Sequence, residues 1–78
     1  MSTPDRTRGI LAIARHVLDR PALTADDDLP GHGATSLSIV RIVAEAHRSL
    51  GLDLDPGAHD GVLTVRVLAR RATVATPS

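Results

Sequence analysis

Apolar residues recur at the spacing of an α-helix in three stretches of the chain. The clearest stretch runs from about Ser36 to Leu50. Because successive helical residues are rotated by about 100°, five of its apolar side chains fall within one arc about 100° wide. These side chains are Ile39, Ile42, Val43, Ala46 and Leu50. Gly51 is a natural C-terminal stop, so the pattern predicts an amphipathic helix that ends there and buries this arc.

A second helix is predicted near the beginning of the sequence. Thr3 is a good N-cap, and Pro4 then occupies the first helical position, where proline is well tolerated. Arg20 precedes Pro21 and should end the helix, because a residue before proline avoids the helical region. The apolar stripe consists of Ile10, Ile13, Ala14, Val17 and Leu18. Its spacing indicates a helix with one buried face.

A third helical pattern begins near Thr64. The residues that it would bury are Val65, Leu68, Ala69 and, at its end, Ala72. The valine-rich start is equally compatible with a β-strand, so we expect a helix and keep the strand as an alternative.

Two irregular segments separate these patterns. Residues 20–35 are long for a loop, and Leu23 and Leu29 indicate that this loop is attached to the core. Residues 51–63 could hold a further short helix. The residues that weaken it are Pro56, Gly57 and Gly61. We therefore predict an all-α fold, a small antiparallel four-helix bundle with a long loop between helices 1 and 2 and a weak or irregular third helix.

Length and composition narrow the function. The 78 residues form a single domain, 1–78, with an expected core over about 4–72 and a flexible tail over 73–78. The absence of cysteine excludes disulfides, thiolate metal sites and a cysteine nucleophile, and it suits a reducing cytoplasm. Zero net charge without aromatic residues argues against nucleic acid. No apolar run approaches the roughly 18 residues of a membrane span. A chain this short hardly encloses an active site, so we expect a cytoplasmic, monomeric binding or carrying module that is not an enzyme.

The polar residues give no sign of a metal or hydrolase site. None of the histidines has the i, i+4 or Cys/His spacing of a known metal site. They are His16, His32, His47 and His59. The Asp26–Asp28 run lacks the alternating spacing of a calcium loop. The nucleophile elbow of a serine hydrolase needs glycine two residues before serine, and position 34 is alanine.

Three arginines form a basic edge that is either solvated or a partner contact: Arg66, Arg70 and Arg71.

The junction at Ser36 carries the most informative chemistry. A glycine-containing loop meets the central helix in the sequence Gly33-Ala34-Thr35-Ser36-Leu37. One interpretation is structural, because serine and threonine cap helices by accepting a free backbone N–H. The other is functional, because the positive end of a helix stabilises a phosphate esterified to such a serine. Leu37 and Arg41 would then face solvent beside it and give a partner protein an apolar contact and a charge.

The order and spacing of four motifs resemble the phosphopantetheine-binding carrier proteins, that is, the acyl carrier and peptidyl carrier proteins. The motifs are Asp26-Asp27-Asp28-Leu29, Gly33-Ala34-Thr35-Ser36-Leu37, Leu50-Gly51, and Thr64-Val65 with Leu68-Ala69. The resemblance covers about residues 10–72. It implies a four-helix bundle and a covalent 4′-phosphopantetheine, derived from coenzyme A, on Ser36. The thiol of that group would hold the cargo as a thioester, and no residue of the chain would be catalytic.

The resemblance also implies which proteins the carrier meets. They are a phosphopantetheinyl transferase, an adenylating or acyl-loading enzyme, and downstream condensing or tailoring enzymes. The residues expected to contact them are Leu37, Arg41, Ala44, Arg48 and Thr35. Fatty-acid carriers usually have aspartate where Thr35 stands, and their second helix is acidic, which favours a nonribosomal-peptide or polyketide pathway here. We expect a free-standing carrier; the alternative is a helical docking module in which Ser36 is only a helix cap.

Overall fold

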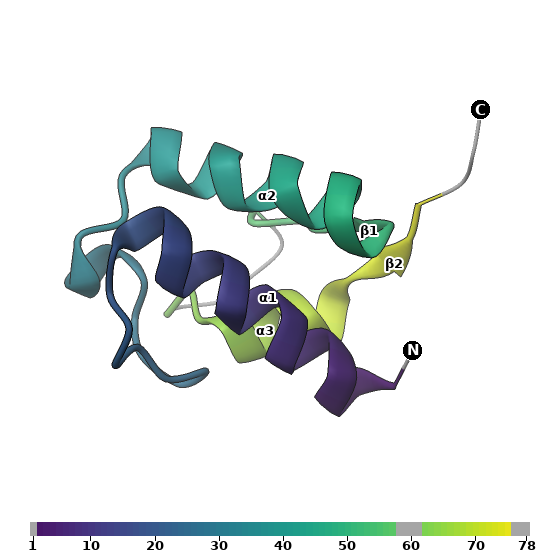
Figure 1. Ribbon diagram of the computed structural model, residues 1–78, viewed down its shortest axis with the longest axis horizontal. Helices are drawn as coiled ribbons and strands as arrows, with labels where there is room; N and C mark the ends of the chain where they lie inside the picture. Colours follow the sequence, from purple (N-terminus) through teal and green to yellow (C-terminus); the bar gives the residue numbers. More distant parts are fainter. Residues whose placement is uncertain (1, 58–61, 76–78) are drawn as a thin grey trace.

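Helices account for most of the structure. The computed structural model describes residues 2–57 and 62–75. Within these ranges the elements are α1 (Thr3–Leu18), the 3₁₀ helix η1 (Pro30–His32), α2 (Ser36–Leu50), β1 (Leu52–Asp53), α3 (Val65–Arg71) and β2 (Thr73–Val74). α1 packs against both α2 and α3, and it runs antiparallel to α2 (Figure 1). All three predicted helical stretches are therefore confirmed, and the strand alternative for the last one is wrong.

The ends of α1 differ by a residue or two from the prediction. The N-cap is Ser2 and not Thr3, because the Ser2 side chain accepts a hydrogen bond from the Asp5 amide at 3.3 Å. The helix ends at Leu18, before the Arg20-Pro21 pair. Asp19 adopts the left-handed conformation with φ 53° and caps the C-terminus. Aspartate tolerates this conformation better than most residues, so the chain turns before proline can act.

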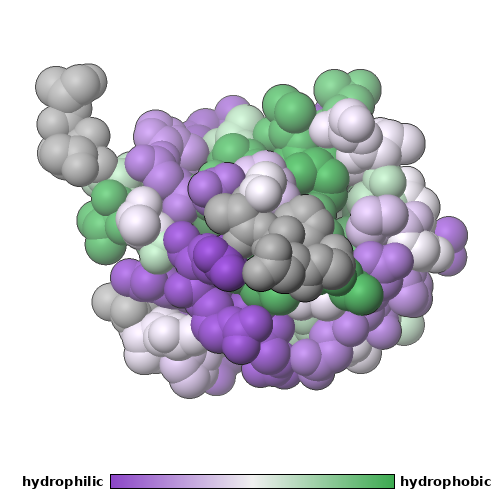
Figure 2. Space-filling model, turned by 180° about the vertical axis from the view of Figure 1, so that it is seen from behind, coloured by the Kyte–Doolittle hydropathy of each residue, from purple (hydrophilic) through white to green (hydrophobic). Residues whose placement is uncertain are grey.

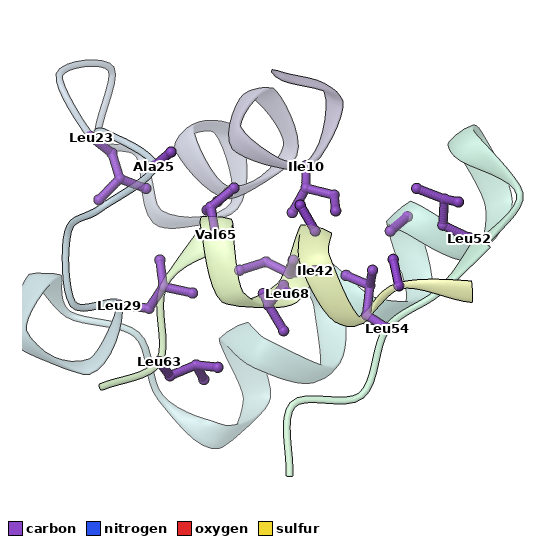
Figure 3. Packing of buried hydrophobic residues seen from close by; sticks show 14 residues of the cluster. Ile10, Leu23, Ala25, Leu29, Ile42, Leu52, Leu54, Leu63, Val65 and Leu68 are labelled. Carbon is purple, nitrogen blue, oxygen red and sulfur yellow. The ribbon is translucent and has the colours of Figure 1, made fainter. Parts of the chain in front are cut away.

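The core contains only aliphatic side chains, which converge from all three helices and from the segments between them (Figure 3). The buried hydrophobic residues are Ile10, Ala14, Leu23, Ala25, Leu29, Ile42, Ala46, Leu52, Leu54, Leu63, Val65, Leu68, Ala69 and Ala72. The predicted arc of α2 faces this core, since Ile42 and Ala46 are fully buried and the other three arc residues pack against them. The helical periodicity thus identified the correct face.

The loop between α1 and α2 is held to the core at several points. Leu23 and Leu29 are buried, as predicted. The Leu29 amide donates to the Leu63 carbonyl at 2.9 Å, and the Arg66 amide donates to the Ala25 carbonyl at 3.0 Å. These two backbone bonds join the loop to the entrance and first turn of α3, so the segment that leads to Ser36 is anchored.

The prediction of an all-α fold is wrong in one detail. β1 and β2 form an antiparallel pair in which Leu52 is opposite Val74 and Asp53 is opposite Thr73. Gly51 ends α2 in the left-handed conformation, and Ala72 ends α3 in an extended one. The extended segments that follow α2 and α3 therefore lie side by side and pair. The first residues of the expected flexible tail, 73–78, consequently form β2.

The predicted weak third helix, which would complete a four-helix bundle, does not appear in the part of the chain that the structure describes. Within 52–57 and 62–64 there is a short strand, a turn and extended chain. The remainder of the expected weak third helix, residues 58–61, lies outside the described residues, as do 76–78. The architecture of the described ranges is thus a three-helix arrangement with a two-residue ladder. None of its helices has the length and apolar character that crossing a bilayer requires.

Candidate functional site: the N-terminus of helix α2

Ser36 is the first residue of α2, and the preceding turn orients it. Gly33 ends η1 with φ 94°, a conformation that favours glycine. The Ala34 amide then donates to the Leu29 carbonyl at 3.0 Å, which ties the turn to a buried residue of the loop. Thr35 is extended, with φ −99° and ψ 174°. The chain therefore enters α2 from an anchored turn.

Thr35, and not Ser36, is the N-cap of α2. Its Oγ1 accepts a hydrogen bond from the Ser38 amide at 3.2 Å. The same oxygen lies 3.1 Å from the Ser38 hydroxyl. The interpretation of Ser36 as a helix cap is thus wrong, because the helix begins at Ser36 itself, one residue earlier than that role requires. Thr35, expected as a partner contact, has a structural role in the chain itself.

The Ser36 hydroxyl remains free for chemistry. The residue is exposed, and its side chain has no hydrogen-bond partner among the described residues. The first turn of α2 contains no acidic residue. Free N–H groups and the helix dipole give this end of the helix partial positive charge. An accessible hydroxyl at this position is suited to carry a phosphodiester, whose negative charge the helix end stabilises.

Two large apolar side chains project from α2 beside Ser36. Leu37 and Val40 are each 61% exposed. Figure 2 shows hydrophobic side chains protruding at the upper edge of the molecule, over α2. Leu37 was predicted to face solvent, whereas Val40 was missed. Its position one turn after Ser36, outside the buried arc, was the available signal.

The other predicted contact residues line a groove between α1 and α2. Arg41, Ala44 and Arg48 are exposed. Together with Glu45 of α2 and with His16 and Val17 of α1, they surround a hollow of about 430 Å³. The structure thus brings these three residues together along one wall, while Leu37 lies nearer the serine.

The charges in this groove are not equivalent. Glu45 accepts hydrogen bonds from the Ser49 hydroxyl, at 2.8 Å, and from Arg48. These two donors hold the pKa of the Glu45 carboxyl below its ordinary value. Arg41 forms no ion pair within the described ranges. Arg41 is consequently the cation of α2 that is most available to a partner.

The remaining polar residues that the structure describes bear on the sequence predictions about a metal site and a basic edge. The described residues contain no group of three or more histidines and acids close enough to hold a metal ion, and His59 lies outside the described residues. Of the predicted basic edge, Arg66 is engaged within the chain. Its guanidinium donates to both carboxylate oxygens of Asp26, at 2.6 and 3.1 Å. Arg70 and Arg71 are exposed.

Comparison with known proteins gives one match. A family model described as the phosphopantetheine attachment site matches residues 8–72. The matched range extends from α1 to the end of α3 and includes Ser36 with its capped turn. No curated protein and no solved structure matches the chain.

Proposed function

The chain belongs to the family of phosphopantetheine-binding carrier domains, and from this premise we propose that Ser36 is the residue that receives the group. Domains of this family hold 4′-phosphopantetheine and are not catalysts themselves, so the chain is a carrier and not an enzyme. The observation that supports Ser36 is its free, exposed hydroxyl at the first position of α2, next to a helix cap supplied by Thr35.

The surroundings of Ser36 fit this prosthetic group. Attachment forms a bond from the Ser36 oxygen to the pantetheine-side phosphorus of the coenzyme A pyrophosphate. The P–O bond between that phosphorus and the adenosine-side phosphate breaks, adenosine 3′,5′-bisphosphate leaves, and a base of the transferase or a water molecule takes the hydroxyl proton. A separate transferase catalyses that exchange, so the carrier needs only to present an accessible oxygen. The Ser36 and Leu37 amides lie at the helix end, where N–H groups have no intrahelical acceptor. When bound, the group supplies a thiol that holds the cargo as a thioester.

The exposed side of α2 is the proposed contact surface for partner enzymes. It combines the apolar Leu37 and Val40 with Arg41, while Ala44 and Arg48 extend it along the groove. A partner with a shallow apolar pocket and a nearby carboxylate would complement this surface. The partners include a phosphopantetheinyl transferase and the enzymes that load and use the cargo.

We place the carrier in a nonribosomal-peptide or polyketide pathway of the cytoplasm, where it holds aminoacyl or acyl intermediates. The support is the charge of α2. Arg41 and Arg48 outnumber Glu45, and the residue directly before the serine is the neutral Thr35. A partner of the acidic fatty-acid carriers, which presents cations, would be repelled by such a helix.

The direct test is covalent labelling. The purified chain is incubated with coenzyme A, Mg²⁺ and a broad-specificity phosphopantetheinyl transferase, and its intact mass is measured. We expect the mass of one phosphopantetheine to be added to the wild type and to Ser38→Ala, and no addition to Ser36→Ala. Ser38 is a matched control because it is the other serine in the first turn and its hydroxyl is already engaged with Thr35.

Folding is checked by circular dichroism for all three proteins. A folded wild type that gains no mass would contradict the proposal, as would a folded Ser36→Ala that is labelled. The first outcome would favour a docking module that uses the same surface, and the second would place the attachment on another residue.

A further inference from the structure

We propose that Thr35 is a positioning residue that keeps the Ser36 hydroxyl available by capping α2 in its place. The inference rests on the proposed function, because it concerns the serine that we assign as the attachment point. It assigns Thr35 a role in modification that is separate from partner contact.

Two neighbouring hydroxyl residues compete for one helix end. Threonine and serine are both good N-caps, and either could accept a backbone N–H at the start of α2. The structure records one outcome, in which Thr35 Oγ1 accepts from the Ser38 amide at 3.2 Å. The Thr35 carbonyl also accepts from the Ile39 amide at 3.0 Å. Thr35 thus satisfies two donors of the first turn, and Ser36 is left inside the helix with a free side chain.

Removal of the Thr35 hydroxyl would make the other outcome favourable. The helix would then start at Leu37, and Ser36 would become the extended N-cap residue. In a capping position the Ser36 oxygen would accept from the Ile39 amide, two or three residues into the helix. A serine oxygen turned back over the helix end and engaged in that bond is less accessible to a transferase. The cap residue therefore determines whether the Ser36 hydroxyl is free to act as the nucleophile.

The neutral side chain of Thr35 has a further effect. Aspartate would cap the helix equally well, but its carboxylate would lie next to the phosphodiester and oppose that negative charge. Threonine caps without adding charge, and its β-branched side chain suits the extended conformation observed at this position.

The test compares two threonines that cap helices in the same chain. Thr35→Val keeps the shape of the side chain and removes only the hydroxyl. Thr64→Val does the same at α3, where Thr64 Oγ1 accepts from the Val67 amide at 3.1 Å. Thr35→Ser is the conservative variant that restores a capping hydroxyl. Each protein is labelled with coenzyme A and the transferase, and kcat and KM are measured separately.

We expect Thr35→Val to lower kcat/KM for labelling by about 2- to 30-fold, which is the population shift that corresponds to the usual range of cap energies. Thr35→Ser should label at close to the wild-type rate. Thr64→Val should lose comparable thermal stability but keep its labelling kcat/KM. An equal loss of labelling in Thr35→Ser would instead indicate that the threonine side chain contacts the transferase.

A second readout does not depend on labelling. In the unmodified protein, NMR should show a helical Cα chemical shift for Ser36 and slow exchange of the Ser38 amide. In Thr35→Val the Ser36 shift should move toward extended values, and the Ser38 amide should exchange faster. Unchanged shifts in a folded Thr35→Val that labels normally would overturn the positioning role while the proposed function stands. If the wild type is not labelled at all, the proposed function itself fails.

Discussion

The N-termini of α2 and α3 begin with the same motif and lead to opposite environments. In each, a threonine side chain accepts a hydrogen bond from the amide three residues later, at 3.2 Å for Thr35 and 3.1 Å for Thr64. The residue that follows the cap is exposed Ser36 in α2 and fully buried Val65 in α3. The capping threonine determines where the helix starts. The next residue determines whether that start presents a reactive group to solvent or packs into the core.

Substitution of the first residue of α3 or of α2 should produce the largest effects, on stability in one case and on labelling in the other. Val65→Ser removes apolar atoms from a fully buried position and buries a hydroxyl, so we expect a loss on the order of 3 kcal/mol in the free energy of unfolding. Ser36→Val should change that free energy by less than about 0.5 kcal/mol and abolish labelling. Urea denaturation measures the free energy of unfolding of both variants, and intact mass measures labelling. Similar losses of stability for the two variants would show that the helix starts do not differ as described.

A second comparison separates exposed apolar residues near the serine from those at the far end. The double variant Leu37→Ala with Val40→Ala should lower kcat/KM for transfer to a partner enzyme by at least about fivefold. Its stability should change little, since both side chains are 61% exposed. Val74→Ala is the matched control, because Val74 is 68% exposed on β2. Equal effects of the two changes would argue against a specific contact surface on α2.

The smallest expected effect concerns the loop that leads to α2. Hydrogen bonds from Arg66 hold the pKa of the Asp26 carboxyl below its ordinary value of 3.8. A carboxyl whose pKa is lower in the folded state stabilises the fold when ionised. That stabilisation is present above the ordinary value and is lost as the pH falls through the folded pKa.

Asp26→Asn should therefore remove a small acid-dependent part of stability, which thermal unfolding at several pH values measures. Both partners are exposed, so the effect should be slight. Arg66→Gln should remove the same part, and the double variant should lose no more than either single variant. Additive losses would mean that the pair does not act as a unit.

The sequence predicted the features that repeat along many residues. The 3.6-residue period of α2 was long enough to identify its buried and exposed faces, so Ile42, Ala46 and Leu37 were assigned correctly. The loop was also anticipated, because Leu23 and Leu29 are large apolar residues in an otherwise polar segment. In both cases burial of apolar surface, which is visible in residue type, determined the structure.

Features decided by one residue or by distant partners were not predictable. Adjacent hydroxyls left the cap ambiguous at Thr35 and Ser36, and likewise at Ser2 and Thr3. The ladder of β1 and β2 joins residues about twenty positions apart over only two pairs, which is too short for an alternating pattern to be recognised. The identity of a helix cap and the pairing of two short strands depend on backbone geometry, which residue type alone does not indicate.

The β1–β2 ladder has a practical consequence for handling the protein. It begins just after α2 ends, so it lies a full helix of 15 residues away from Ser36, or about 20 Å at the rise of an α-helix. The beginning of α1 lies toward that same end of the molecule (Figure 1). An affinity tag, a fluorescent fusion or a sensor-chip linker that is joined before α1 or after β2 would therefore leave Ser36 accessible to an incoming enzyme.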